Sequence, residues 1–238
     1  MSAVTEREQF LRAFHDARPG ITSRALARTG SYERLAARVP TGHVLDLACG
    51  DGPLLRLLGP RAIGVDLSRG ELSHARETDD VHVLQARAQQ LPFRDACFDA
   101  ATCHLAFMLF EDLEEVVAEL ARVLKPGAPF LALLGGGPTA DGDDAFHRFA
   151  ALLPRGPRFG DRRTSTEAGW RELFAGWGAV AFERWPLDLG GRFDEVWRFL
   201  GASYQLADAG RIERELRARF PGDHVPCTVV TYLASVTR

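Results

Sequence analysis

The stretch VLDLACGDGPL, from Val44 to Leu54, decides the fold because it joins a buried strand to a glycine turn and a helix start. Its apolar run carries one carboxylate, Asp46, and breaks at Gly50 and Gly52. Glycine allows a tight turn and lets the backbone approach a ligand where a Cβ would clash. A helix after such a turn offers free N–H groups to an electron-rich group. The stretch therefore predicts a ligand site at the end of the first strand.

The composition of the 238-residue chain is that of a soluble globular protein, with 46% hydrophobic and 26% charged residues. Its length fits one α/β domain with an insertion. The net charge, 29 basic minus 32 acidic residues or −3, favours neither nucleic acid nor an anionic membrane as a partner. No apolar run could span a bilayer, the first ten residues lack a signal-peptide core, and the four cysteines form no CxxC pair. We therefore expect a cytoplasmic protein with reduced thiols, no membrane partner and no nucleic-acid partner.

Strand and helix patterns alternate along the chain after residue 40. Strand patterns occupy 43–48, 61–67, 81–87, 97–105 and 130–136, and helix patterns occupy 53–58, 69–77 and 111–124. Strands that alternate with helices predict an α/β fold with a parallel sheet and right-handed crossovers. In such a sheet a ligand binds at the carboxyl ends of the strands, near the switch in strand order.

Three pieces of the chain lie outside this alternation. They are a helical leader at 1–40, a Gly/Pro/Asp/Arg-rich insertion at 137–165, and two helices at 192–220 ahead of a last strand at 225–236. We expect the leader to be followed by a single domain over 41–238. The insertion holds three aspartates in TADGDDAFH, residues 139–147, but their spacing fits no calcium loop. This segment therefore predicts a solvated loop, and we expect no metal.

The ligand at the glycine turn is predicted to be a cationic nucleoside rather than a diphosphate. A dinucleotide fingerprint has a third glycine three residues after the second, and position 55 is leucine. Asp46 places negative charge beside the turn, which suits a cation. Asp66 ends the second strand, where an acid can accept hydrogen bonds from both ribose hydroxyls. Taken singly, Asp46 would fit a buried structural acid and Asp66 a helix N-cap, so the prediction depends on their combination.

Four blocks of the chain follow one another in a characteristic order and spacing: VLDLACGDG at 44–52, AIGVDLS at 62–68, LPFRDACFDA at 91–100 and ELARVLKPGAPFLAL at 119–133. Together they resemble the class I S-adenosylmethionine-dependent methyltransferases, and most closely the small-molecule branch that includes the ubiquinone and menaquinone methyltransferases. The resemblance covers roughly residues 41–136, about two-fifths of the chain. It implies a Rossmann-like, seven-stranded, mostly parallel sheet with its last strand antiparallel, a helical N-terminal leader and a C-terminal helical lid insertion. It also implies S-adenosyl-L-methionine as cofactor and S-adenosyl-L-homocysteine as its product.

The resemblance assigns the cofactor to residues at the ends of the first two strands. Asp46 and the backbone at Ala48 and Gly50 would hold its methionine end, although many family members have glycine in place of Ala48. Asp66 would bind the ribose, and Leu67 would pack on the adenine.

One departure from the family lies at the adenine position. Before LPF the family usually has Asp-Ala, whose acid takes the adenine amino group, and this chain has Arg87 followed by Ala88. Arginine cannot accept a hydrogen bond. The Ala88 N–H would still serve the ring, and Gln89 would replace the missing acceptor.

The expected chemistry is an in-line displacement, for which proximity and alignment supply most of the acceleration. A base is needed only when the acceptor is a hydroxyl, a carbon acid or a protonated amine. His104 ends the fourth strand pattern, beside the expected methyl group, and is either that base or a residue that packs against the cofactor. Cys103 is expected to pack at the cofactor rather than to act as a nucleophile.

The leader and the C-terminal helices are expected to close the site. Tyr32 would lie near the sulfonium, and Arg24 or Arg28 near the methionine carboxylate; an exposed helix with incidental arginines is the alternative. A helical stripe would form a lid over an apolar or aromatic acceptor, or else belong to an ordinary core. It consists of Phe193, Val196, Trp197, Leu200 and Tyr204.

The function predicted from these features is methyl transfer to O, N or C of a small organic molecule, in secondary metabolite biosynthesis, by a monomer or homodimer. One alternative is a protein that binds S-adenosylmethionine without methyl transfer, for regulation or a pericyclic reaction. Another is an RNA or protein methyltransferase, which the net charge of −3 disfavours.

Overall fold

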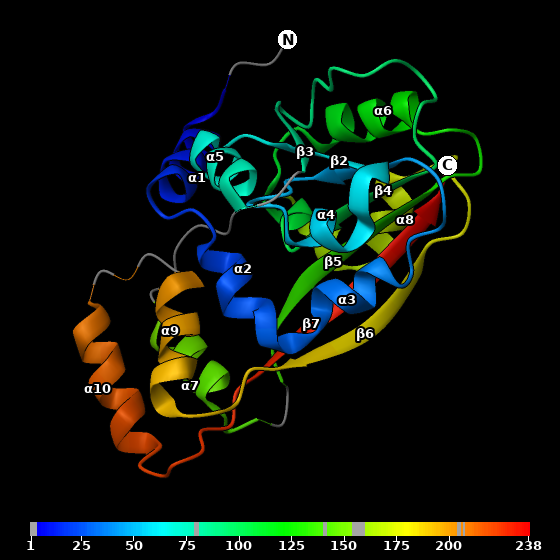
Figure 1. Ribbon diagram of the computed structural model, residues 1–238. Coiled ribbons are helices and arrows are strands. Elements are labelled where there is room, and N and C mark those ends of the chain that lie inside the picture. The colour runs from blue at the N-terminus through cyan, green and yellow to red at the C-terminus, as the bar shows by residue number, and fades with distance from the viewer. Residues whose placement is uncertain (1–3, 79–80, 140–141, 154–159, 204–205, 207) are drawn as a thin grey trace.

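A sheet of seven strands forms the centre of the computed structural model, which describes residues 4–78, 81–139, 142–153, 160–203, 206 and 208–238 (Figure 1). The strands lie in the order β3-β2-β1-β4-β5-β7-β6. Their bounds are β1 Val44–Leu47, β2 Ala62–Asp66, β3 His82–Gln85, β4 Ala100–His104, β5 Pro129–Pro138, β6 Ala181–Asp188 and β7 Thr228–Thr237. β7 pairs antiparallel with both β5 and β6, and the other neighbouring pairs are parallel. The predicted mostly parallel sheet with an antiparallel last strand is confirmed.

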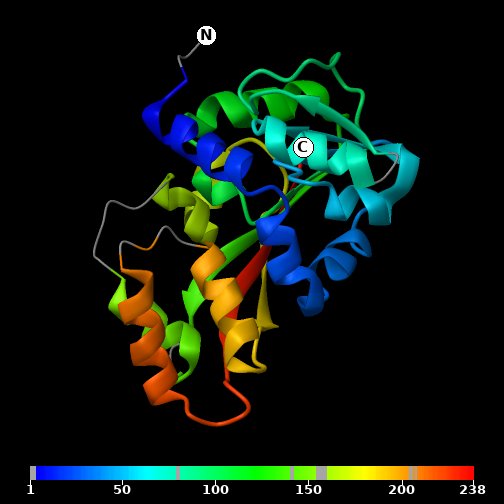
Figure 2. The same ribbon diagram turned by 60° about the vertical axis from the view of Figure 1, so that its left-hand side comes forward.

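Helices cover both faces of the sheet. One face carries α4 Pro53–Leu58 and α5 Arg69–Thr78, and the other carries α6 Leu113–Val123 and α8 Glu167–Leu173. The leader forms α1 Glu6–Ala17, α2 Ile21–Leu26 and α3 Ser31–Ala36, and a separate group comprises α7 Ala145–Leu152, α9 Phe193–Ser203 and α10 Ala209–Arg219. Figures 1 and 2 show α1 beside α5, and α7, α9 and α10 gathered together away from α6. None of the helices in the described ranges has both the length and the apolar character that a membrane crossing needs.

The side chains of β1 alternate between two cores because successive residues of a strand point to opposite faces of the sheet. Leu45 and Leu47 pack in the core against α6 and α8, whereas Val44 packs in the core against α4 and α5. Asp46 therefore shares the face of Val44. Its partner in the neighbouring strand β4 is Thr102, which faces the same way.

Three elements are not predicted by the sequence patterns, namely α7, α8 and β6. β6 is an edge strand that contains Pro186, which the middle of a sheet would not tolerate, and five of its eight residues are exposed. The expectation of a solvated loop at 139–147 is wrong at Asp144, because this residue is buried at the start of α7. Its carboxylate accepts hydrogen bonds from His147 N at 2.9 Å and from Thr228 N at 2.7 Å, so it joins α7 to β7.

Candidate active site

A cavity of about 850 Å³ lies at the carboxyl ends of β1, β2 and β4, and α1 and α2 contribute to its wall. Such an edge is where α/β sheets bind ligands, and the volume is within the usual range of small-molecule sites. The cavity brings together nine predicted site residues from distant parts of the sequence: Tyr32, Asp46, Ala48, Gly50, Asp66, Leu67, Ala88, Gln89 and His104. Their individual roles stay predictions, but their shared location is a property of the fold.

The turn after β1 has left-handed backbone at three positions, with φ of 53° at Ala48, 55° at Gly50 and 81° at Gly52. This conformation strains a residue that has a Cβ, so Ala48 is the unusual member of the three. The heavy atom nearest to a Cβ added at Gly50 would be Glu71 Oε2, 3.9 Å away. The turn therefore leaves room for another molecule to approach its backbone at Gly50.

Asp66 at the end of β2 is held by two backbone N–H groups. Its Oδ2 accepts a hydrogen bond from Gly50 N at 2.9 Å, and its Oδ1 accepts one from Ser68 N at 2.8 Å. Burial raises the pKa of Asp66, although these two hydrogen bonds act in the opposite direction. Because each carboxylate oxygen can accept two hydrogen bonds, the oriented group keeps acceptor capacity for a pair of ligand hydroxyls.

Four carboxylates gather at one end of the cavity: Asp46, Asp51, Asp66 and Glu71. Burial raises the pKa of Asp46 to about 7, and the charge of Asp66 adds to this shift, although the Thr102 hydroxyl, 2.7 Å away, opposes it. A positive charge among these groups would relieve their repulsion and favour the ionised form of Asp46. This acidic end therefore suits a cationic ligand.

Hydrogen bonds join the leader, at and just after α1, to α5 beside the acidic end. His15 Nδ1 lies 2.9 Å from Glu71 Oε1, and Gly20 N donates to Glu71 Oε2 at 2.8 Å. Burial alone would lower the pKa of His15, but the bond to Glu71 and the carboxylates nearby raise it. Asp16 Oδ1 accepts a hydrogen bond from Gly70 N at 2.9 Å in the first turn of α5. These contacts make α1 part of the cavity wall.

The other end of α1 reaches the predicted adenine position through Glu8. Arg87 Nη2 donates to both oxygens of Glu8, at 2.9 and 2.8 Å, and Gln89 Nε2 donates to Glu8 Oε1 at 3.1 Å. The sequence patterns do not predict this contact. The only local signal is a capping box, with Thr5 and Glu8 at the start of α1, which predicts a helix terminus and not a long-range ion pair.

His104 ends β4 and contacts the leader. Its ring stacks on Tyr32, with centroids 4.0 Å apart and an interplanar angle of 23°. Its Nε2 lies 3.0 Å from Ser31 Oγ, a partner that the sequence does not predict. Burial lowers the pKa of His104 to about 3, so the imidazole is neutral near pH 7. The ring is thus held by a hydrogen bond to Ser31 and by stacking on Tyr32, so the geometry supports the packing alternative.

Two residues expected at the cofactor lie elsewhere. Cys103 points into the core against α6 and α8, because it alternates with His104 along β4, and it does not line the cavity. Arg28 donates through Nη2 to Leu189 O in the loop after β6. Arg24 is exposed and does not line the cavity, but its guanidinium lies beside Gly20, next to Asp51, so its role at the methionine carboxylate stays a prediction.

The second end of the cavity is apolar. It is lined by Leu26, Met108, Phe146, Leu187, Phe199 and Val229. Of the predicted helical stripe on α9, Val196 and Leu200 are buried in the core, and Trp197 is half-buried against it. Tyr204 lies outside the described residues. The stripe on α9 is therefore mostly core, and Phe199, which the stripe omits, is the α9 side chain that reaches the cavity.

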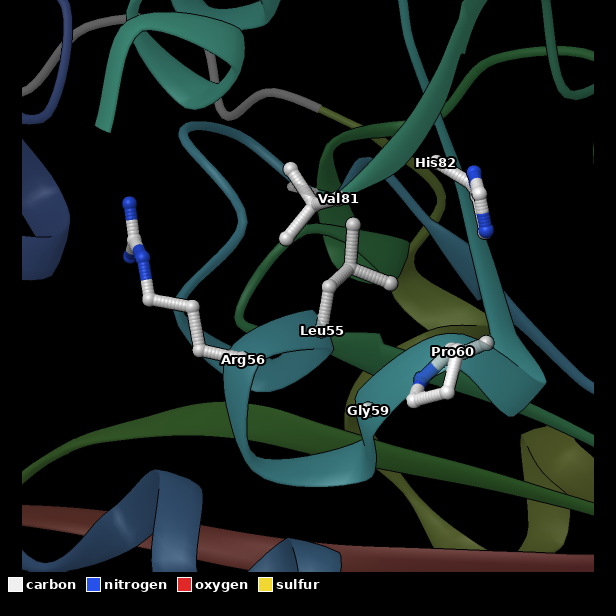
Figure 3. Close-up of a pocket in the computed structure, with 7 residues that line it drawn as sticks. Leu55, Arg56, Gly59, Pro60, Val81 and His82 are labelled. Atoms are coloured by element: carbon white, nitrogen blue, oxygen red, sulfur yellow. The ribbon is translucent and has the colours of Figure 1, made fainter. Parts of the chain in front are cut away.

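A smaller cavity of about 190 Å³ lies near the amino end of β2 and is separate from this site (Figure 3). It is lined by Leu55, Arg56, Gly59, Pro60, Ala62, Val81 and His82. Figure 3 shows Leu55 and Val81 facing one another across it. It shares no lining residue with the large cavity and contains none of the predicted site residues.

Replacement of His104 by glutamine is expected to reduce the acid sensitivity of the folded chain. The unfolded chain protonates His104 near its ordinary pKa of 6.5, whereas the folded chain keeps it neutral until about pH 3. Stability is therefore lost as the pH falls from 6.5, by about 1.4 kcal/mol per unit. Between pH 6.5 and 5 the unfolding free energy of His104→Gln should gain about 2 kcal/mol relative to wild type. Urea unfolding at both pH values tests this, with exposed His82→Gln as control, and a pH-independent difference would contradict it.

Comparisons with known proteins find similarity in the segment that contributes the four carboxylates of the acidic end. Residues 45–132 match the model of the methyltransferase domain family. A demethylmenaquinone methyltransferase from Thermus thermophilus is 38% identical over 109 residues, which are 42% of this chain and 50% of that relative. The chain thus spans about half the length of this relative.

Solved structures resemble a larger part of the chain. The YcgJ protein from Bacillus subtilis is 24% identical with a TM-score of 0.59, over 87% of this chain and 97% of that one. Phosphoethanolamine N-methyltransferase 2 from Haemonchus contortus, in complex with phosphomonomethylethanolamine and S-adenosylhomocysteine, is 14% identical with a TM-score of 0.61, over 99% and 60% of the two chains. At these identities the likeness shows the fold alone.

Proposed function

We infer that this chain is an S-adenosylmethionine-dependent methyltransferase acting on a small organic molecule, because residues 45–132 match a methyltransferase domain. The observation that supports the inference best is one cavity with two unlike ends, carboxylates around the glycine turn and apolar side chains opposite. The acidic end suits the ammonium and sulfonium charges of S-adenosyl-L-methionine, and the apolar end suits the acceptor.

The residues at the acidic end fit the cofactor in their donor and acceptor chemistry. Asp46 and the backbone at Ala48 and Gly50 would hold its amino-acid end, and Asp66 its ribose. The cofactor, when bound, supplies a methyl group on a positively charged sulfur. The contribution of the chain is to align the acceptor with that group and to exclude water, which is where most of the acceleration in such displacements arises.

The acceptor is proposed to be a neutral, apolar or aromatic molecule. Within the described residues, the side chains that β5, β6, β7, α7 and α9 contribute to the cavity wall are all uncharged. A carboxylate or phosphate on the acceptor would be desolvated there without a cation to pair with, at a cost of several kcal/mol. The atom that receives the methyl group is O, N or C of such a molecule.

The test combines binding with transfer of a labelled methyl group. Calorimetry should show that the chain binds S-adenosyl-L-methionine and S-adenosyl-L-homocysteine, and label should then reach members of a panel of neutral aromatic acceptors. Phe199→Ala should raise the KM for such an acceptor with little change in S-adenosylhomocysteine affinity, because Phe199 lines only the apolar end. Label in bulk RNA or lysate protein would favour a macromolecular acceptor, and binding without turnover on any acceptor would favour a non-catalytic role.

A further inference from the structure

Four residues line a further part of the cavity wall, beside Asp66, that is here called the base end: Glu8, Arg87, Ala88 and Gln89. Ala86 N donates to Asp66 O at 3.2 Å, so the segment after β3 runs beside the carboxyl end of β2. Gln90 N donates to Arg87 O at 3.0 Å and closes a turn with Ala88 and Gln89 at its tip. The proposed function places a ribose on Asp66, and the role of the base end rests on that proposed function. With the ribose on Asp66, the base end faces the base of the nucleoside.

The carboxylate of Glu8 has no acceptor capacity left for a ligand. Its Oε1 accepts from Arg87 Nη2 at 2.9 Å and from Gln89 Nε2 at 3.1 Å. Its Oε2 accepts from Arg87 Nη2 at 2.8 Å and from Thr5 N at 3.1 Å. Four hydrogen bonds fill the lone pairs of a carboxylate. The ion pair with Arg87 also cancels the charge of both groups, which suits an uncharged ring.

The amide of Gln89 is oriented by two acceptors. Its Nε2 donates to Glu8 Oε1 at 3.1 Å and to Glu111 O at 2.9 Å, which uses both of its hydrogens. A flipped amide would bring its oxygen against these two oxygens, so the network determines which way the group points. Among the side chains of these four residues, the carbonyl Oε1 of Gln89 is thus the acceptor that this network of hydrogen bonds leaves for a ligand. Beside it, among the hydrogen bonds of the described residues, the Ala88 N–H takes no internal acceptor.

We propose that Gln89 Oε1 and the Ala88 N–H together read the edge of the cofactor's base, and that Glu8 is the positioning residue that orients the Gln89 amide. Adenine presents an amino donor next to a ring-nitrogen acceptor, which complements one acceptor beside one donor. Hypoxanthine presents a carbonyl next to a ring N–H, so both contacts become repulsive. The leader helix would therefore determine base specificity although Glu8 itself makes no contact with the base.

The test compares the affinities of S-adenosyl-L-homocysteine and S-inosyl-L-homocysteine, its hypoxanthine analogue, by calorimetry on the full chain. We expect the wild type to prefer the adenine compound by about 100-fold, since mismatched buried polar groups discriminate strongly. Gln89→Met and Glu8→Ala should each lower this ratio about tenfold, the worth of roughly one hydrogen bond. In Glu8→Ala the freed amide can turn its NH₂ toward the carbonyl of hypoxanthine. Gln90→Met and Glu6→Ala are matched controls on the same turn and the same helix, and should keep the ratio within about twofold.

The ratio of the two affinities distinguishes base recognition from a simple loss of stability, because a destabilised leader would weaken the binding of both ligands equally. Tight binding of S-adenosyl-L-homocysteine with no preference in the wild type would overturn the proposal. A ratio that falls in Gln89→Met but not in Glu8→Ala would overturn the positioning role of Glu8. Failure of the wild type to bind either compound would instead overturn the proposed function, so the two failures are distinguishable.

Discussion

Trp170→Ala is expected to lower the free energy of unfolding by about 3–5 kcal/mol, the range for removal of a large buried aromatic side chain. Trp170 on α8 is fully buried in the core against α6. Its ring stacks on Phe130 at 5.7 Å and 11°, and its centroid lies 4.9 Å from that of Phe174. Its Nε1 donates to Thr164 O at 2.9 Å, so the substitution leaves both a cavity and a buried carbonyl without its partner.

Urea unfolding followed by far-ultraviolet circular dichroism measures this loss without relying on tryptophan fluorescence. Trp177→Ala is the matched control, because Trp177 is half-buried at the edge of the same aromatic group, and it should cost clearly less. A loss below about 1 kcal/mol for Trp170→Ala would mean that α8 does not belong to the cooperative core.

Asp66→Ala is expected to raise the dissociation constant of S-adenosyl-L-homocysteine roughly 10- to 150-fold, or about 1.5–3 kcal/mol, the range for hydrogen bonds to a charged group. The substitution removes the acceptor proposed for the ribose hydroxyls. It also releases the N–H groups of Gly50 and Ser68, which orient the carboxylate from both sides. The loss should appear as faster dissociation, because the mutated group lies inside the cavity and not on its rim.

Calorimetry gives the affinity, and a thermal melt of the same samples shows whether the turn has changed. Glu77→Ala is the control, because it removes a carboxylate from the exposed side of α5 near the site. Unchanged affinity in Asp66→Ala would refute the ribose role. A loss of affinity accompanied by an equal fall in the melting temperature of the ligand-free chain would point to a damaged turn instead.

Most of the sheet is predictable from sequence because its strands have strong local signals. β1, β2 and β4 are apolar runs that end at a glycine turn or a polar residue, and α6 has apolar residues at helical spacing. β6 lacks such a signal, since five of its eight residues are exposed and it contains Pro186. Its place in the sheet depends on pairing with β7, some forty residues later.

The site residues also differ in how far the sequence predicts them. Residues at strand ends, such as Asp46 and Asp66, are predictable because all strands of a parallel sheet end at one edge. Glu8 and Ser31 are not predictable, because their partners Arg87 and His104 are 79 and 73 residues away in the sequence and no local pattern indicates either contact. The prediction that Cys103 packs at the cofactor is wrong, because neighbours on a strand point to opposite faces and His104 is the one that lines the cavity.

The position of β7 between β5 and β6 has a consequence for the order in which the molecule assembles. β1 to β5 can pair in turn as the chain emerges from the ribosome, whereas β6 has no partner in the described sheet until β7 is made. Until then the edge of β5 stays open to wrong pairing. Leu187 on β6 and Val229 on β7 both line the apolar end of the cavity. The acidic end of the cavity can therefore form early in synthesis, while the apolar end is completed last.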